Sequence, residues 1–172
     1  DSQALLVTPS AALIESVNEA LHDLLKVLPR IAQASGALTH SRAILVDDLD
    51  SAVQVSNDYA PEHLILNVAD PRRLLLSVEN AGSIFLGRYT PESLGDYTSG
   101  TNHVLPTYGH ARTLSGLSVQ SFQKLVTVQE ASAEGLVAIG PTAITLANAE
   151  GLTAHALAVQ LRLRAIALEG RP

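Results

Sequence analysis

The chain has 172 residues, of which 47% are hydrophobic and 16% charged, and its formal net charge is −6. No apolar run approaches the roughly 18 residues of a membrane span, and the 11 Lys and Arg residues are scattered, so neither a membrane nor a nucleic acid is expected as a partner. Because the chain has no Cys, it contains no disulfide, cysteine nucleophile or thiolate zinc site, and any metal must be bound by His, carboxylate or amide oxygen.

The first residues carry no familiar targeting signal. The segment DSQALLVTPSAALIE has no basic start, and Thr-Pro-Ser interrupts its apolar run, so we expect no secretory signal peptide and a cytoplasmic location. The chain starts at Asp1 without Met and enters a predicted strand almost at once, which is typical of a piece of a longer protein.

Strands and helices are predicted to alternate in residues 1–112. Apolar runs predict strands at residues 4–7, 43–46, 63–66 and 83–86. Helices are expected after the first three runs, where capping residues or a cap followed by Pro appear: Thr8-Pro9 to about residue 28, Asp47-Asp48 to about residue 56, and from Asp70-Pro71 onward. This alternation predicts an open, mostly parallel α/β layer, which we describe as Rossmann-like but incomplete.

Residues 113–172 are predicted to form a helical extension. Thr127 and Glu130 fit a capping box, Gly140-Pro141 is expected to interrupt the helical signal, and Gly151 is expected to separate the last two helices. The last helix has one apolar stripe, made of Leu152, Ala156, Val159, Leu163 and Ile166. We expect this stripe to pack on the chain's own sheet or on a partner subunit.

Residues 94–108, LGDYTSGTNHVLPTY, have neither the period of a helix nor the alternation of a strand, and we expect a loop. The loop follows the carboxyl end of the strand at residues 83–86, which is where open α/β sheets bind ligands. Asp96 and His103 are either metal ligands or, respectively, a turn residue and a surface side chain, and the loop alone does not decide between these interpretations.

Two other places combine carboxylate and imidazole groups. Pro61 stiffens a turn that presents Glu62 and His63 together, either as an acid-base pair or as a solvated strand end. Glu150 and His155 lie on either side of Gly151. For His155, a histidine packed at an interface is the simpler interpretation, and a metal ligand is the alternative. Taken from the residues alone, a metal site of Asp96, His103 and His155, with Glu62 or His63 as general base, leaves the reaction open.

Several long segments carry a resemblance to a known family. The chain resembles, over essentially its whole length, the C-terminal part of histidinol dehydrogenase, through NDYAPEHL, NAGSIFLGRYTPESLGDYTSGTNHVLPTYGHART, SGLSVQSFQK and AEGLTAHALAV. The resemblance implies a zinc-dependent homodimer that oxidises L-histidinol through L-histidinal to L-histidine with NAD, as the last reactions of histidine biosynthesis.

The resemblance also implies roles for individual residues. Glu62 and His63 match the catalytic acid-base pair, and Asp96 matches a zinc ligand. His155 matches a second zinc ligand, which in this family reaches the metal of the neighbouring subunit. Substrate contacts are implied for Glu150 and His103, and also for His63, Asp96 and His155.

The resemblance leaves part of the expected machinery outside this chain. In the family, two further zinc ligands, a Gln and a His, and the domain that holds most of the NAD precede the segment matched here. No glycine-rich dinucleotide fingerprint replaces them. We therefore expect this chain alone to be inactive. The alternatives are a catalytically silent α/β dimerisation module and a stand-alone metallohydrolase built on Asp96, His103 and His155.

Overall fold

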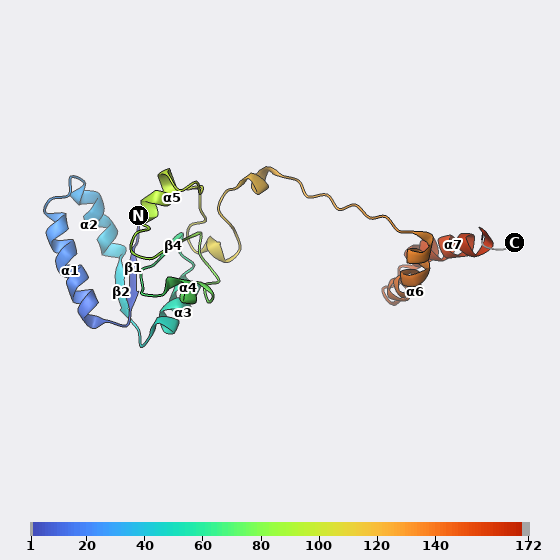
Figure 1. The fold of residues 1–172 in the computed structure, drawn as a ribbon, viewed down its shortest axis with the longest axis horizontal. Helices are drawn as coiled ribbons and strands as arrows, with labels where there is room; N and C mark the ends of the chain where they lie inside the picture. Colours follow the sequence, from blue (N-terminus) through green and yellow to red (C-terminus); the bar gives the residue numbers. More distant parts are fainter. Residues whose placement is uncertain (1, 170–172) are drawn as a thin grey trace. The chain divides into compact units, whose positions relative to one another are not determined.

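The computed structural model describes residues 2–169, and the chain forms two compact units, Asp1–Gln123 and Lys124–Pro172 (Figure 1). The structure thus groups residues 113–123 with the first unit. In chain order the elements are β1 (Leu5–Thr8), α1 (Ala11–Leu25), α2 (Ile31–His40), β2 (Arg42–Leu45), α3 (Leu49–Tyr59), β3 (His63–Leu66), α4 (Pro71–Leu75), β4 (Ser83–Leu86), α5 (Glu92–Tyr97), the 3-10 helices η1 (His110–Arg112) and η2 (Val119–Phe122), α6 (Ala133–Ala149) and α7 (Thr153–Glu169).

All four strands pair in parallel, as the alternation of strands and helices predicts. β1 pairs with β2, with Leu5 opposite Arg42, and β3 pairs with β4, with His63 opposite Ser83. Within residues 2–169 these pairs form two separate two-stranded sheets and not one continuous sheet. The mixed α/β class and the C-terminal helical part are confirmed, whereas a Rossmann-type arrangement stays a prediction.

Helix caps account for most of the helix starts. Asp48 caps α3, and Asp70 caps α4 with Pro71 at its first position, both as predicted. The predicted cap of α1 is wrong. The helix is capped by Ser10 and not by Thr8, and the Ser10 side chain accepts a hydrogen bond from the Leu13 amide in the first turn. The α1 helix also ends at Leu25, short of the predicted residue 28.

Two helices were not predicted. The sequence of α2, IAQASGALTH, contains Gly36 and starts without a side-chain cap, so its local signal is weak. The α5 helix covers the start of the segment expected to be a loop, and Gly95 lies in its middle. A Cβ at Gly95 would lie 2.8 Å from Cε1 of Phe85, so this short helix packs closely on β4. We infer that this packing specifies the helix, since the sequence of the segment has no helical periodicity.

The core of the first unit is small and lies around the second sheet. Val53 of α3, Leu66 of β3 and Leu74 of α4 are buried together, with Leu64 and Ile84 packed against them. Helices α1 and α2 lie side by side next to β1 and β2 (Figure 1), and neither contains a buried residue. The best packed part of this unit is therefore the part that contains β3.

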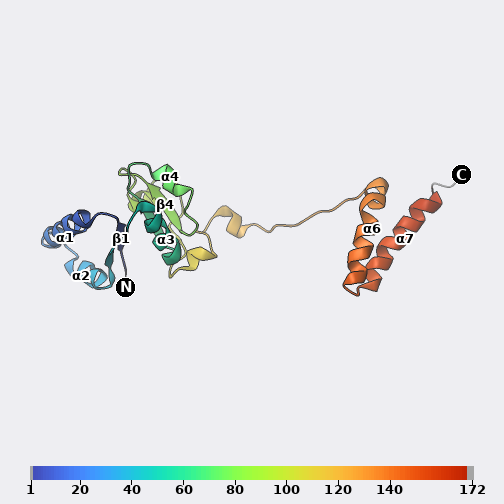
Figure 2. The same ribbon diagram turned by 90° about the horizontal axis from the view of Figure 1, so that it is seen from below.

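The second unit is a pair of helices joined at Gly151, which has a φ of 73° (Figure 2). Part of the predicted apolar stripe packs on α6 of the same chain: Ala156 is buried, and a Cβ at Gly140 would lie 3.2 Å from both Val159 and Leu163. Leu152, which precedes α7, is exposed. The cover expected from the sheet or from a partner subunit is thus supplied, for the packed part of the stripe, by α6. Gly140 permits the close approach of the two helices.

Two further predictions for this unit are wrong. Residues 127–130 do not cap a helix, because α6 starts at Ala133 with Ser132 as its cap, accepting from the amide of Gly135. Gly140-Pro141 lies inside α6 and does not interrupt it. The contacts of Gly140 with α7 explain why the helix continues there, since they form only if both helices are intact.

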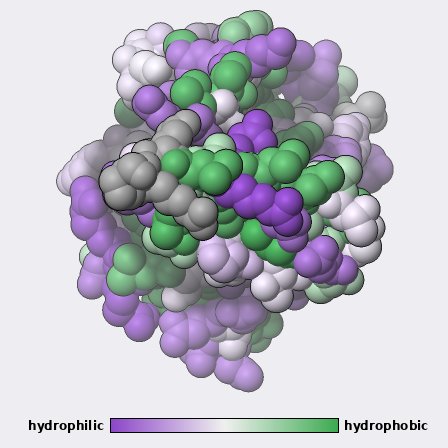
Figure 3. All heavy atoms as spheres, turned by 90° about the vertical axis from the view of Figure 1, so that its right-hand side faces the viewer, coloured by the Kyte–Doolittle hydropathy of each residue, from purple (hydrophilic) through white to green (hydrophobic). Residues whose placement is uncertain are grey.

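Hydrophobic side chains remain exposed on the helix pair, among them Val137, Ile139, Leu157, Leu161 and Leu168. Hydrophobic (green) areas are accordingly prominent in the surface view of Figure 3. Exposure on this scale is typical of a surface that another chain or segment covers. In the part of the chain that the structure describes, no helix is both long and apolar enough to cross a membrane.

Candidate active site

The turn between α3 and β3 presents Glu62 and His63. α3 ends at Tyr59, and its C-cap residue, Ala60, is almost fully buried and has a left-handed backbone with a φ of 53°. The Gly82 amide donates to the Pro61 carbonyl (2.9 Å), and the Ser83 amide donates to the Glu62 carbonyl (2.9 Å). These bonds fix Glu62 and His63 at the amino end of β3.

Residues after β4 return to this same end of the sheet. The Asp96 carboxylate, on α5, lies with Oδ1 4.0 Å from Nε2 of His63. Nδ1 of His103 lies 3.3 Å from the backbone carbonyl of Asp96, which ties the following loop to α5. Together these residues surround a pocket of about 280 Å³, lined by Glu62, His63, Asp96, Tyr97 and His103.

The imidazole of His63 is held by packing and not by a polar partner. Its ring lies 5.9 Å, centroid to centroid, from the buried ring of Phe85. Within the described residues, Nε2 is buried and has no hydrogen-bond partner, and 4.0 Å to Asp96 is too long for a hydrogen bond. An unpaired buried nitrogen costs free energy, so its persistence calls for an explanation, and one explanation is a role in chemistry.

The position of this pocket differs from the one expected. Open α/β sheets usually bind ligands beyond the carboxyl ends of their strands, whereas Glu62 and His63 lie at the amino end of β3. From the sequence, one possible explanation is that the strand at residues 63–66 runs antiparallel to its neighbours, and this is wrong, because β3 and β4 are parallel. The loop expected at the carboxyl end instead leads back, through α5, to His63.

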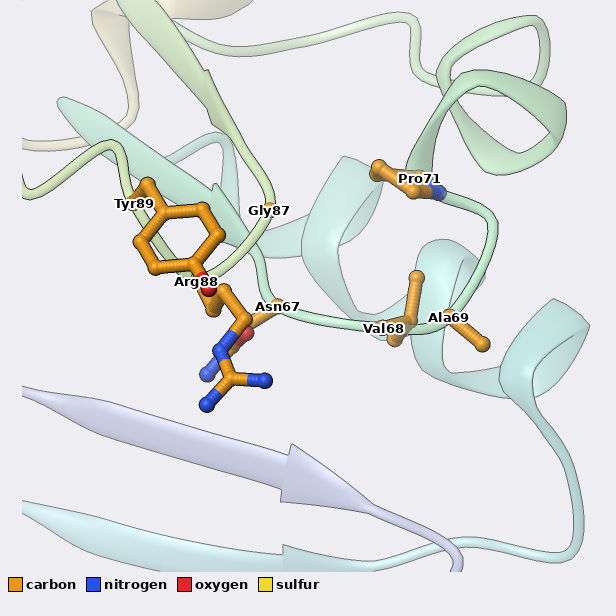
Figure 4. A pocket seen from close by; sticks show the side chains of 7 residues that line it. All are labelled: Asn67, Val68, Ala69, Pro71, Gly87, Arg88 and Tyr89. Atoms are coloured by element: carbon orange, nitrogen blue, oxygen red, sulfur yellow. The ribbon is translucent and has the colours of Figure 1, made fainter.

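The carboxyl ends of β3 and β4 hold a different, larger pocket of about 810 Å³ (Figure 4). It is lined by Asn67, Val68, Ala69, Pro71, Gly87, Arg88 and Tyr89, and shares no residue with the pocket at His63. The guanidinium of Arg88 lies 5.2 Å from the centre of the Tyr89 ring.

The remaining predicted site residues belong to the second unit. Glu150 is the residue after α6, and His155 is in the first turn of α7. Both side chains are exposed. Sequence reasoning missed one residue that lines the pocket at His63, namely Tyr97. Because only 3% of the residues are aromatic, an aromatic residue next to Asp96 could have indicated a binding site.

A metal site is not complete within the described residues. Residues 2–169 contain no group of three or more His, Asp or Glu side chains placed to hold one metal ion. The donor types suit zinc, which binds imidazole nitrogen and carboxylate oxygen, but zinc sites in proteins have three or four protein ligands. The pocket at His63 therefore contains donors for part of a zinc site but not for a complete one.

Comparisons with known proteins identify the family. The family model for histidinol dehydrogenase matches residues 1–163. The chain is 58% identical over 163 residues to the histidinol dehydrogenase of Xanthomonas campestris pv. campestris and 52% identical over 170 residues to that of Vibrio vulnificus, covering 95% and 99% of this chain but 38% and 39% of the relatives.

A solved structure agrees with these relatives. The crystal structure of histidinol dehydrogenase from Elizabethkingia anophelis matches with a TM-score of 0.90 and 42% identity, over 96% of this chain and 38% of that one. The chain thus spans somewhat over a third of the length of the proteins it matches. On these matches in sequence and in fold, the chain belongs to the histidinol dehydrogenase family.

Proposed function

We propose that this chain supplies the acid-base pair and part of the zinc site of an enzyme that oxidises L-histidinol through L-histidinal to L-histidine. The family membership supports histidinol oxidation in histidine biosynthesis, and it supports neither a silent dimerisation module nor a stand-alone metallohydrolase. The observation that carries the proposal is the pocket itself, because residues assigned separately from the sequence, Glu62, His63, Asp96 and His103, line it together.

In this proposal His63 is the base for the alcohol. Its imidazole, which lines the pocket, accepts the alcohol proton of L-histidinol, and NAD would supply the two-electron acceptor for the hydride when bound. Glu62, next to it in the same pocket, removes a proton from the water that attacks the aldehyde and passes it to the former carbonyl oxygen, which gives the hydrate. Glu62, ionised again, then removes a proton from the hydrate as the second hydride leaves. His103 contributes to binding the substrate, and Glu150 and His155 are assigned as further substrate contacts.

Asp96 and His155 are assigned as two of the zinc ligands. Bound zinc supplies positioning of the substrate, through the imidazole and amine of histidinol. Since two ligands do not complete a zinc site, the remaining ligands and most of the NAD site are expected outside this chain. We further propose a cytoplasmic homodimer in which His155 reaches the partner's site. The exposed hydrophobic residues of α6 and α7 support such an association.

The test uses a reconstituted pair: this chain together with the N-terminal part of the Xanthomonas campestris enzyme, which this chain does not match, as a separate chain. In this pair we expect His63→Asn to lower kcat by about 100- to 10,000-fold without changing the zinc content. Asp96→Ala is expected to lower the zinc content first, since a site that loses an anionic ligand loses both charge and geometry. Zinc is measured by elemental analysis and turnover by NADH absorbance.

The control for the pair is the Xanthomonas campestris enzyme divided at the same place into two chains. If this control is active while the reconstituted pair with unaltered residues is not, the proposed function is wrong. If His63→Asn and Asp96→Ala change the zinc content equally, the assignment of a base and a ligand to these two residues is wrong.

A further inference from the structure

A buried asparagine joins the end of α3 to the segment that precedes β4. Asn57 is 6% exposed and lies one helical turn before the Glu62 turn. Its Nδ2 donates to the Ser77 carbonyl (2.9 Å), and its Oδ1 accepts from the Glu79 amide (2.8 Å) and, more weakly, from the Asn80 amide (3.4 Å). The amide side chain thus satisfies backbone groups of a segment far away in the sequence.

Side chains from two other segments hold the last carbonyls of α3. Asn80 Nδ2 donates to the Asn57 carbonyl (3.0 Å), and Arg112 Nη2 donates to the Asp58 carbonyl. Helix carbonyls at a C-terminus have no partner within the helix, so these two bonds fix how α3 ends. Ala60 follows α3 with a left-handed backbone, which is uncommon for a residue other than glycine.

The segment held by Asn57 is the one that binds the catalytic turn. Residues 79–80 lead directly into Gly82 and Ser83, whose amides donate to the carbonyls of Pro61 and Glu62. Gly82 lies so close that a Cβ there would be 2.6 Å from the Glu62 carbonyl oxygen. Because of these two hydrogen bonds and this close approach, we expect a shift of residues 79–83 to displace Glu62 and His63.

We propose that Asn57 is a positioning residue for the Glu62–His63 pair, with Asn80 and Arg112 as its supports. Asn57 does not line the pocket, and within residues 2–169 its side chain has no hydrogen bond to a residue that does, so we infer that it acts through the backbone of residues 79–83. This inference rests on the proposed function only where it concerns turnover. The positioning itself is a property of this chain and is tested separately.

The first experiment is amide hydrogen exchange on the chain of 172 residues, comparing Asn57→Leu with Thr8→Val. Leu is close to Asn in shape but makes no polar contact, so we expect the Gly82 and Ser83 amides to exchange at least about 10-fold faster. Thr8 is equally buried but lies on β1, away from the turn, and its loss should leave these two amides unchanged. Unchanged exchange at Gly82 and Ser83 in Asn57→Leu would overturn the proposal.

The second experiment is kinetics in the reconstituted pair. A displacement of the pair by about 1 Å lowers kcat by up to 100-fold, so we expect Asn57→Leu to lower kcat 10- to 100-fold with the KM for L-histidinol and the zinc content unchanged. Asn57→Asp retains the acceptor for the Glu79 amide and should recover part of the loss. Asn80→Ala removes a single bond and serves if Asn57→Leu fails to fold.

The two experiments separate this inference from the proposed function. Faster exchange at Gly82 and Ser83 with no histidinol oxidation by the unaltered pair leaves the positioning correct and the proposed function wrong. Full turnover in both Asn57→Leu and Asn80→Ala, in a pair that is active when unaltered, means that Asn57 does not position the catalytic residues. A loss of kcat in Thr8→Val equal to that in Asn57→Leu would also overturn the proposal, because it would make the effect one of stability.

Discussion

At the scale of single residues, the site depends on a close backbone contact as much as on its chemical groups. Gly82 lies against the carbonyl of Glu62, the residue to which we assign water activation. No side chain fits in this space, because Cβ atoms essentially never approach an oxygen to 2.6 Å. The position therefore requires glycine for reasons of space.

Replacing Gly82 tests this contact. We expect Gly82→Ala to lower the free energy of unfolding of the chain by about 1–3 kcal/mol, as overpacking does, when measured by urea unfolding. The matched control is Gly36→Ala in α2, where a Cβ would meet nothing within 4 Å. There alanine is expected to be neutral or to stabilise by up to about 1 kcal/mol, through helix propensity. Equal effects of the two changes would show that the contact at Gly82 does not constrain the fold.

The sequence predicted the chemical residues of the pocket better than the residues that hold them. Glu62, His63, Asp96 and His103 stand out because a carboxylate or imidazole in a loop or at a strand end needs a reason. Asn57 stands in a helix of ordinary composition, and nothing local indicates that its amide bonds residues 77–80. Such a contact joins segments far apart in the chain, and a single sequence contains no signal for it.

At the scale of elements, the start of a helix could be predicted from the sequence where a side chain caps it. The strands at residues 63–66 and 83–86 and the caps Asp48 and Asp70 were predicted correctly, since apolar runs and capping residues act within a few residues. The short helix α5 and the uninterrupted course of α6 were not predicted. Both depend on close packing between elements, of Gly95 against Phe85 and of Gly140 against α7. Tertiary packing overrides propensity at these two glycines.

The cap of α3 has a pH dependence that can be measured. A hydrogen bond from the Ser51 amide lowers the pKa of Asp48 below its usual 3.8. A carboxyl group whose pKa is lower in the folded state stabilises the fold above its unfolded pKa, and this contribution is lost as the pH falls through the folded pKa. Asp48→Ala should therefore lower the urea midpoint at neutral pH, and the difference from the unaltered chain should shrink below pH 3.8.

The comparison for this cap is Asp48→Asn, which keeps an oxygen acceptor without a charge that titrates. We expect it to be more stable than Asp48→Ala at every pH and to show a weaker pH dependence than the unaltered chain. A midpoint difference between Asp48→Ala and the unaltered chain that is the same at neutral pH and below pH 3.8 would contradict a charged cap.

At the scale of the whole molecule, the chain spans only 38% of its Xanthomonas campestris relative, and the site that we propose is only partly contained in it. The pocket at His63 contains the proposed acid-base pair and one proposed zinc ligand, and the other proposed zinc ligand, His155, lies in α7. Composition excluded thiolate chemistry, and the family motifs predicted the pair. The sequence placed Glu62 and His63 at the start of the strand at residues 63–66, as the structure has them. It did not predict that Asp96 and His103 would meet them there, because that depends on the path of residues 87–103.

The central claim is that this chain holds the proton-transfer residues of histidinol oxidation but not the complete zinc and NAD sites. The measurement that tests it most directly is NADH formation from L-histidinol, with zinc and excess NAD, by this chain alone, by the N-terminal part of the Xanthomonas campestris enzyme alone, and by the reconstituted pair. We predict no activity from either part and activity from the pair, because two ligands do not complete a zinc site. Histidinol oxidation by this chain alone would contradict the account.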